Sequence, residues 1–281
     1  MTGKEIHVIK ASGESEPFSA LKLRKSLKRA RIPRDLQNEL LADLQENLYD
    51  NIPTVQIYNQ VLKSLQDLDY SQGKARYSLK QAIMMFGPSG YPFEKFMAEV
   101  FTSRGYKTDL DIIFKGKCTK HEIDVVAHKR GEYLLTECKF HNRTGIRSDI
   151  KHCLYVKARF DDIMANWQGK LSRVKFVRPC LVTNTKFSVR SIRYGECAGI
   201  KLIGWNYPEK NSLRDWVEKA NLHPITCLTS LSQAQKARLL EEGIVLCRDL
   251  SKAEPRLLKG FGIPSHLIAE AIGEAKLVSS L

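Results

Sequence analysis

Three charged residues within residues 121–140 have the types and spacing of a small reactive cluster. Two short apolar runs in this segment flank the turn-like residues 129–132, and this pattern predicts two paired β-strands. Asp124 opens the first strand, and Glu137 and Lys139 close the second. Because residues two apart on a strand project to the same face, Glu137 and Lys139 would lie side by side, with Asp124 opposite them in an antiparallel pair.

Such a cluster suits metal-dependent cleavage of phosphodiester bonds. Mg²⁺ usually takes one or two carboxylates together with waters and phosphate oxygens, so Asp124 and Glu137 are candidate metal ligands. The metal would offset the repulsion between these acids, polarise a phosphodiester and activate a water. Lys139 would orient that water or stabilise charge on the phosphate. The alternative for so short a pattern is a hairpin whose strands have polar ends.

A third acid and a second cation are candidates for the same site. Apolar residues recur at helical spacing through residues 91–106, and Glu94 lies at the edge of that stripe. A carboxylate there would be half desolvated and would need a partner, although an ordinary flanking residue is the alternative. Lys157 projects from the apolar face of a later helix. Its partner is either Asp161, one turn on, or the acidic cluster.

Length, composition and charge limit the classes of protein. The chain has 281 residues, enough for two or three domains, and 43% of them are hydrophobic, enough for buried cores. Its formal net charge of +14 favours a polyanionic partner and does not choose between DNA, RNA and an acidic membrane. The sequence has no apolar run near 18 residues and no signal peptide, which predicts a cytoplasmic protein without a membrane partner. Its seven cysteines form no C-x-x-C pair and predict reduced, mostly buried thiols.

The order of elements in residues 90–206 is that of an α/β fold. This part resembles the PD-(D/E)XK nucleases, specifically the Mrr-like restriction endonucleases and Holliday-junction resolvases. The segments GYPFEKFMAEVFTSRGY, HEIDVV, LLTECKF and CLVTNTKFS carry the resemblance. It implies a restriction-endonuclease-like fold with a mixed sheet. The catalytic acids of the family fall on Asp124 and Glu137, its lysine on Lys139 and its helix glutamate on Glu94.

Residues 1–87 predict a small, mostly helical domain that ends at Gly87-Pro88-Ser89-Gly90. It resembles an ATP-cone, a regulatory nucleotide-binding domain, through HVIKASGESEPFSALKLRKSL and NIPTVQIYNQVLKSL. The resemblance implies ATP or dATP as a regulatory ligand. The residues that would approach the nucleotide are Lys10, Gly13, Lys22, Thr54 and Tyr58.

This domain departs from the ATP-cone pattern at two positions. The usual Lys-Arg pair is Lys10-Ala11, and the usual histidine is Tyr58. Basic side chains around a glycine turn near a helix N-terminus are nevertheless a reasonable phosphate site. The alternative is a helical module whose lysines are merely solvated.

Residues 222–281 predict two all-α hairpins. The second contains Gly260-Phe261-Gly262 between its helices and resembles a helix-hairpin-helix unit, which implies contact with DNA phosphates. A helical cap with a structural or protein-docking role is the alternative.

Together these features predict a metal-dependent DNA endonuclease that uses Mg²⁺ or Mn²⁺. We expect its activity to be regulated by ATP or dATP, and we expect a homo-oligomer. Two alternatives remain from the sequence. One is a non-catalytic, nucleotide-regulated DNA-binding protein, and the other is a nuclease specific for RNA or branched DNA.

Overall fold

The computed structural model describes residues 5–167 and 176–280, and residue contacts divide the chain into two units. The first unit contains Met1–Ala82, His223–Lys236 and Cys247–Leu281, and the second contains Ile83–Leu222 and Ala237–Leu246. The predicted mixed α/β, multi-domain class is confirmed. Most of the C-terminal residues group with the N-terminal ones, a long-range association for which the sequence carried no signal.

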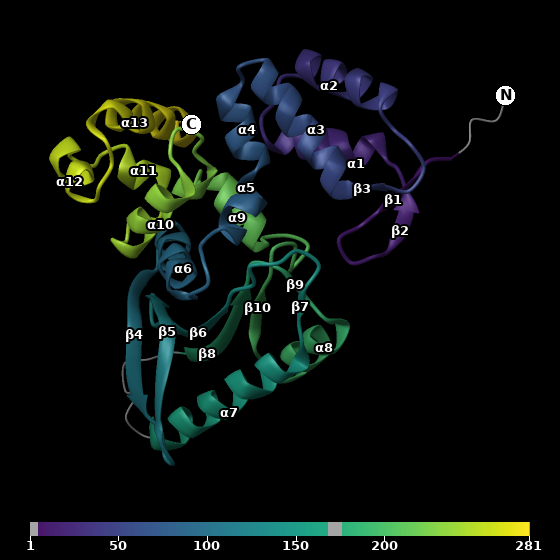
Figure 1. Cartoon of the computed structure of the whole chain (residues 1–281). Helices are drawn as coiled ribbons and strands as arrows, with labels where there is room; N and C mark the ends of the chain where they lie inside the picture. Colours follow the sequence, from purple (N-terminus) through teal and green to yellow (C-terminus); the bar gives the residue numbers. More distant parts are fainter. Residues whose placement is uncertain (1–4, 168–175, 281) are drawn as a thin grey trace. The chain divides into compact units, whose positions relative to one another are not determined.

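The second unit is built around a five-stranded mixed sheet in the order β10-β8-β6-β5-β4 (Figure 1). Its strands are β4 (Lys107–Lys115), β5 (Lys120–Lys129), β6 (Glu132–Lys139), β8 (Phe176–Thr183) and β10 (Lys201–Ile203). β4, β5 and β6 are antiparallel, whereas β6, β8 and β10 run parallel. Parallel neighbours need crossover connections, which contain α7 (Ile150–Trp167) and α8 (Val189–Cys197).

Helices cover both faces of this sheet. α6 (Tyr91–Ser103) packs against β4, β5 and β6, and α7 packs against β4, β6 and β8 on the other side (Figure 1). The predicted stripe of α6 is fully buried and consists of Phe93, Phe96, Met97, Val100 and Phe101. Because both faces are covered, β5 has consecutive buried residues at Val125, Val126 and Ala127. The remaining elements of this unit are β7 (Arg147–Ser148), β9 (Lys186–Phe187) and α9 (Leu213–Lys219).

The N-terminal part of the first unit packs helices on a small sheet of order β2-β1-β3. The strands are β1 (His7–Ile9), β2 (Ser15–Pro17) and β3 (Ile52–Pro53). The helices are α1 (Ala20–Arg29), α2 (Arg34–Glu46), α3 (Thr54–Asp67) and α4 (Ser71–Tyr77), and α5 (Leu79–Met84) follows them. Ser19 caps α1 by accepting the Lys22 N–H at 3.3 Å. Apolar residues from the strands and helices form one core around Leu27, Leu44 and Ile52.

The C-terminal part consists of short helices, as its all-α prediction states. They are η1 (Ile225–Cys227), α10 (Gln233–Glu241), α11 (Cys247–Leu250), α12 (Pro255–Gly260) and α13 (Ser265–Ser279). Gly262 has a φ of +80°, a left-handed conformation that glycine adopts without strain, and it allows the tight turn from α12 into α13. α13 packs against α11, α12 and α4, and these four helices belong to the first unit, whereas Ala237–Leu246, which includes the end of α10, belongs to the second.

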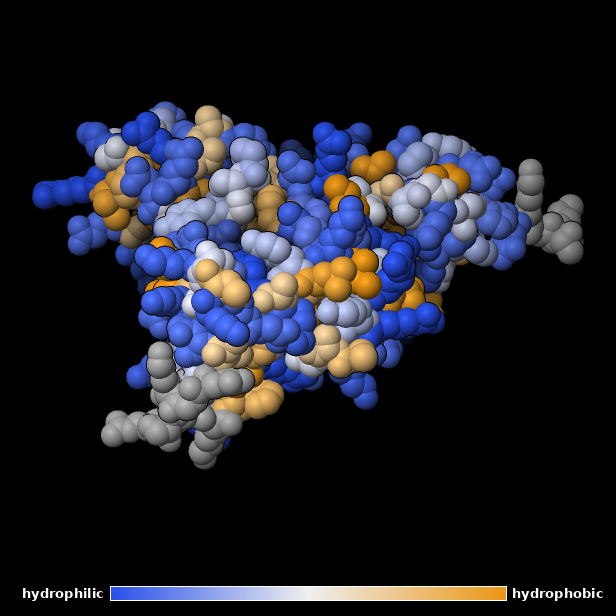
Figure 2. All heavy atoms as spheres, turned by 90° about the horizontal axis from the view of Figure 1, so that it is seen from below, coloured by the Kyte–Doolittle hydropathy of each residue, from blue (hydrophilic) through white to orange (hydrophobic). Residues whose placement is uncertain are grey.

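The surface of the described residues is mixed in polarity. Figure 2 shows one face on which hydrophilic residues predominate and hydrophobic ones form separate patches. In residues 5–167 and 176–280, no helix is both long enough and apolar enough to cross a membrane. All seven cysteines are free thiols and five are buried, as the sequence predicted.

Candidate active site

β5 and β6 bring together the acids that the sequence singled out. Asp124 does not open its strand as predicted, because β5 begins at Lys120 and Asp124 lies within it. The ladder between these strands ends at the pair Val125 and Thr136. Asp124 is the residue of β5 just beyond that last pair. Its carboxylate accepts the backbone N–H of Cys138 at 2.7 Å and thereby bridges the two strands. The side chain of Asp124 is thus fixed beside the strand that carries Glu137 and Lys139.

Glu94 joins this group from the first turn of α6. Burial is the main cause that raises the pKa of its carboxyl to about 7, and the negative charges of Asp124, Asp111, Glu137 and Glu122 add to the shift. These charges act on Glu94 because they lie close to it. Glu94 is therefore within the electrostatic influence of these acids, which supports its inclusion in the cluster.

Asp124 and Glu137 are also poorly solvated. Burial and then the charge of Asp124 raise the pKa of Glu137 to about 7, against the opposing effects of Arg159 and Lys139. Burial raises the pKa of Asp124, although the Cys138 N–H opposes the shift. Carboxyl groups held together under these conditions repel each other, and such groups are concentrated at functional sites.

Arg159 of α7 is a component of the site that the sequence analysis missed. Its guanidinium donates a short hydrogen bond to Glu137 Oε2, and the side chains are only 11% and 23% exposed. Lys157, by contrast, donates to both carboxylate oxygens of Asp161 at 2.6 Å, so its local partner is the correct alternative. The signal for Arg159 was its position between Val156 and Ile163, on the buried side of the helix.

Asp111 of β4 is a second component that was missed. It has a φ of +55°, an uncommon left-handed conformation for a residue with a side chain. The register pairs Leu110 with Val125 and Ile112 with Ile123, so Asp111 lies across from Asp124 where the ladder is interrupted. Its charge raises the pKa of both Asp124 and Glu94. Strained residues of this kind are concentrated at functional sites.

The raised pKa of Glu94 leads to a prediction about stability in metal-free buffer. The pKa of Glu94 is about 7 in the folded state and 4.5 in the unfolded state. Between these pH values the folded state holds a proton that the unfolded state releases. The stability of the wild type therefore falls as the pH rises from 4.5 through 7. Glu94→Gln removes the part of this loss that Glu94 contributes. We expect the variant to melt at a higher temperature than the wild type at pH 8. The difference should disappear below about pH 4.5, and equal melting temperatures at pH 8 would contradict the raised pKa.

The described acids do not by themselves form a multidentate metal site. Among the side chains of residues 5–167 and 176–280, no three His, Cys, Asp or Glu residues meet in a group that could hold a metal ion. The two predicted ligands have protein partners, since Asp124 accepts from Cys138 and Glu137 accepts from Arg159. Any metal at this position would have to combine protein carboxylates with other oxygen ligands.

A separate cluster lies at the start of the chain. Lys10 and Lys22 both pair with Glu16, at 2.7 Å and 2.9 Å, and Gly13 forms the intervening turn with a φ of +83°. Hydrogen bonds from the two lysines lower the pKa of Glu16. The structure thus brings three predicted nucleotide contacts together around an acid that the sequence analysis missed.

The other two predicted nucleotide contacts lie on α3. Thr54 is its first residue, and Tyr58 stacks on Tyr77 with ring centres 5.5 Å apart. Burial raises the pKa of Tyr58 well above its ordinary value, so its hydroxyl stays neutral. Tyr58 therefore contributes an aromatic contact in this domain, where the ATP-cone pattern has a histidine.

Comparison with known proteins identifies both ends of the chain. Residues 6–82 match the ATP cone domain, and residues 223–279 match the family described as AF1548-like, C-terminal. An uncharacterized protein of Archaeoglobus fulgidus is 37% identical over 182 residues, which make up 65% of this chain and 99% of that protein. The chain belongs to the AF1548-like family.

A solved structure extends the comparison to the fold. The crystal structure of the protein of unknown function AF1548 is 35% identical, has a TM-score of 0.58, and covers 68% of this chain and 98% of its own. Both relatives are described only as uncharacterized or of unknown function. The activity of this AF1548-like protein has to be argued from its own residues.

The ATP-cone domain supports nucleotide binding by this AF1548-like protein, and the cluster around Glu16 lies within it. Phosphate groups that approach Lys10 and Lys22 would compete with Glu16. We therefore expect Glu16→Gln to raise the affinity for ATP or dATP by about two- to fivefold, the range set by an exposed ion pair. Calorimetric titration checks this, with Glu39→Gln on the exposed side of α2 as the control. A weakened affinity would show that Glu16 positions the lysines instead.

Proposed function

We propose that this AF1548-like protein is a metal-dependent endonuclease that hydrolyses DNA phosphodiester bonds and is regulated by a nucleotide on its ATP-cone domain. The observation that carries the proposal is the grouping of Glu94, Asp124 and Glu137, with Lys139 two residues beyond Glu137 on β6. Burying several carboxylates together costs free energy unless a cation compensates their charge, and this cost is notable in a chain whose net charge is +14.

The chemistry of these residues fits Mg²⁺ or Mn²⁺. Asp124 and Glu137 would hold the ion as hard oxygen ligands, and two carboxylates are the usual protein share of a Mg²⁺ shell. When bound, the metal would polarise the phosphodiester and lower the pKa of a water. Repulsion between the acids raises their pKa values. The positive charge of the ion would offset this repulsion by attracting each carboxylate.

The other residues have separate roles in this proposal. Lys139 would place its ammonium where charge develops on the phosphate or beside the attacking water. Glu94 would support the metal shell or the water from α6. The order α6-β4-β5-β6-α7-β8, with an antiparallel meander followed by a parallel strand, supports a restriction-endonuclease-like core, because the resemblance in sequence covers the same elements.

A non-catalytic, nucleotide-regulated DNA-binding protein is the second candidate. Its support is the pairing of Glu137 with Arg159, which gives the acid a structural partner without any metal. Under this candidate the acids would stabilise the sheet and α7, and the basic surface alone would bind nucleic acid.

Cleavage assays on a panel of substrates test the proposal and separate the candidates. Supercoiled, linear, single-stranded and branched DNA, and RNA, are each incubated with Mg²⁺ or Mn²⁺, with and without ATP or dATP. We expect metal-dependent cutting of DNA that a chelator stops, and a change in its rate when nucleotide is added. Binding of DNA without cutting of any substrate would favour the second candidate, and cutting of RNA or branched DNA alone would redefine the substrate.

A further inference from the structure

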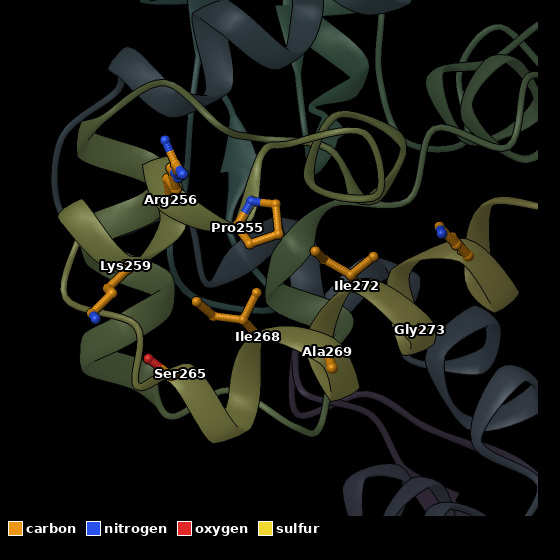
Figure 3. Close-up of a pocket in the computed structure, with 9 residues that line it drawn as sticks. Pro255, Arg256, Lys259, Ser265, Ile268, Ala269, Ile272 and Gly273 are labelled. Atoms are coloured by element: carbon orange, nitrogen blue, oxygen red, sulfur yellow. The ribbon is translucent and has the colours of Figure 1, made fainter.

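A groove between α12 and α13 belongs to neither candidate site. It has a volume of about 570 Å³, within the usual range for ligand sites. Pro255, Ile268 and Ile272 give it an apolar interior, and Figure 3 shows the two isoleucines projecting from α13 toward the proline. Arg256, Lys259 and Lys276 also line it, and among the described lining residues none is acidic. The groove therefore combines an apolar interior with cationic edges.

The groove is elongated along α13. Its lining residues on this helix run from Ser265 to Lys276 at spacings of three and four, so they share one face over three turns. At 1.5 Å of rise per residue, that face is about 16 Å long. A face of this length and polarity suits an amphipathic helix, which docks through apolar residues spaced over successive turns.

Gly273 supplies an independent reason to expect a helix at this place. Glycine destabilises a helix interior relative to alanine, so packing or function usually explains it there. Apart from its chain neighbours and the backbone of its own helix, no heavy atom lies within 4 Å of the position that a Cβ of Gly273 would occupy, so packing within the chain does not require the glycine. Ala269 lies one turn before it and also lines the groove. Small residues four apart let the backbone of a second helix approach closely.

We propose that this groove binds an acidic amphipathic helix of a partner protein. The apolar face of that helix would cover Ile268 and Ile272 and would cross α13 at Gly273. Its acidic flanks would pair with Arg256, Lys259 and Lys276. A DNA backbone would satisfy the cations but leave the apolar interior uncovered, and a second copy of this chain would bring like-charged edges together. The acidic helix satisfies both features of the groove.

Binding of a synthetic peptide to the full chain tests this assignment. The probe is a fluorescent helical peptide of about five turns, with leucine on one face and glutamate on its flanks. A second peptide has lysine in place of glutamate. By fluorescence anisotropy we expect the acidic peptide to bind at least about tenfold more tightly than the basic one, and to bind more weakly as salt rises.

Matched variants locate the binding. Lys259→Glu should lower the affinity for the acidic peptide by about tenfold or more. Lys252→Glu, at an exposed position outside the groove, should change its affinity by less than about twofold. Gly273→Leu fills the groove and should abolish binding, whereas Gly260→Leu, which also adds a side chain in open space, should not. Circular dichroism of each variant checks that the helices remain folded.

Three results would overturn the proposal. The first is equal binding of the two peptides, or acidic-peptide binding that Lys259→Glu and Gly273→Leu leave unchanged. The second is that neither peptide binds, whereas a short DNA duplex binds to the wild type and no longer binds to Gly273→Leu. This result would assign the groove to nucleic acid. The third is a dimer in light scattering that Gly273→Leu converts to a monomer. The inference does not rest on nuclease activity, so the two proposals fail separately.

Discussion

Glu137→Gln and Asp124→Asn will each lower the rate of metal-dependent DNA cleavage by about a thousandfold or more, equivalent to about 4 kcal/mol of transition-state stabilisation. Each substitution keeps the shape of the side chain and removes the charge that would hold the metal. Asp124→Asn also weakens the bridge to Cys138, because an amide oxygen accepts an N–H less strongly than a carboxylate. Single-turnover cleavage of the best substrate at saturating Mn²⁺ measures the effect.

The control for these variants is Glu209→Gln, which removes one negative charge at an exposed position of the same unit. It should cut at the wild-type rate. Neutralising one of several mutually repelling acids relieves the folded state, but Glu137→Gln also removes the charged partner of Arg159, so circular dichroism checks that each variant is folded. Full cleavage by Glu137→Gln would show that this acid is structural.

Lys139→Ala will lower the cleavage rate by about a hundred- to a thousandfold, the usual cost of removing one donor to a developing negative charge. The lysine is the last residue of β6 and its charge lowers the pKa of Glu137, which supports a place for its ammonium close to the proposed metal ligand. Because its contribution grows as charge develops, the loss should fall on kcat and leave KM within about threefold. Steady-state kinetics with a fluorescent duplex separates the two constants.

Lys115→Ala is the matched control, because this lysine is the exposed last residue of β4, another strand of the same sheet. Its removal should leave kcat unchanged. Lys139→Arg should restore part of the rate by replacing the charge. A rise in KM alone in Lys139→Ala would assign this lysine to DNA binding and not to the chemical step.

The hairpin with Asp124, Glu137 and Lys139 could be predicted because its determinants are local. Two apolar runs joined by a short turn fix the pairing of β5 and β6, and the strand period fixes which side chains share a face. Glu94 was also accessible, since helical spacing placed it at the edge of a stripe that the structure buries completely. These residues needed no information about distant parts of the chain.

The components that were missed depend on contacts between distant segments. Asp111 joins the site through the register of β4 on β5 and an unusual backbone conformation, neither of which has a local signal. Arg159 reaches Glu137 across 22 residues of sequence. Helical periodicity could have identified it as a buried cation, but the predicted cation was Lys157, which pairs locally. Glu16 was missed because the predicted nucleotide contacts included no acidic residue, and its pairing with Lys10 and Lys22 depends on the folded turn.

Titration of the metal-free protein with Mn²⁺ tests the central claim most directly, because it needs no knowledge of the substrate. The account predicts a binding isotherm for the wild type that is lost or weakened by about tenfold or more in Asp124→Asn and in Glu137→Gln, and is unchanged in Glu209→Gln. If the wild type binds no Mn²⁺, or if all of these proteins bind it equally, the acidic cluster does not hold the catalytic metal and the nuclease proposal fails.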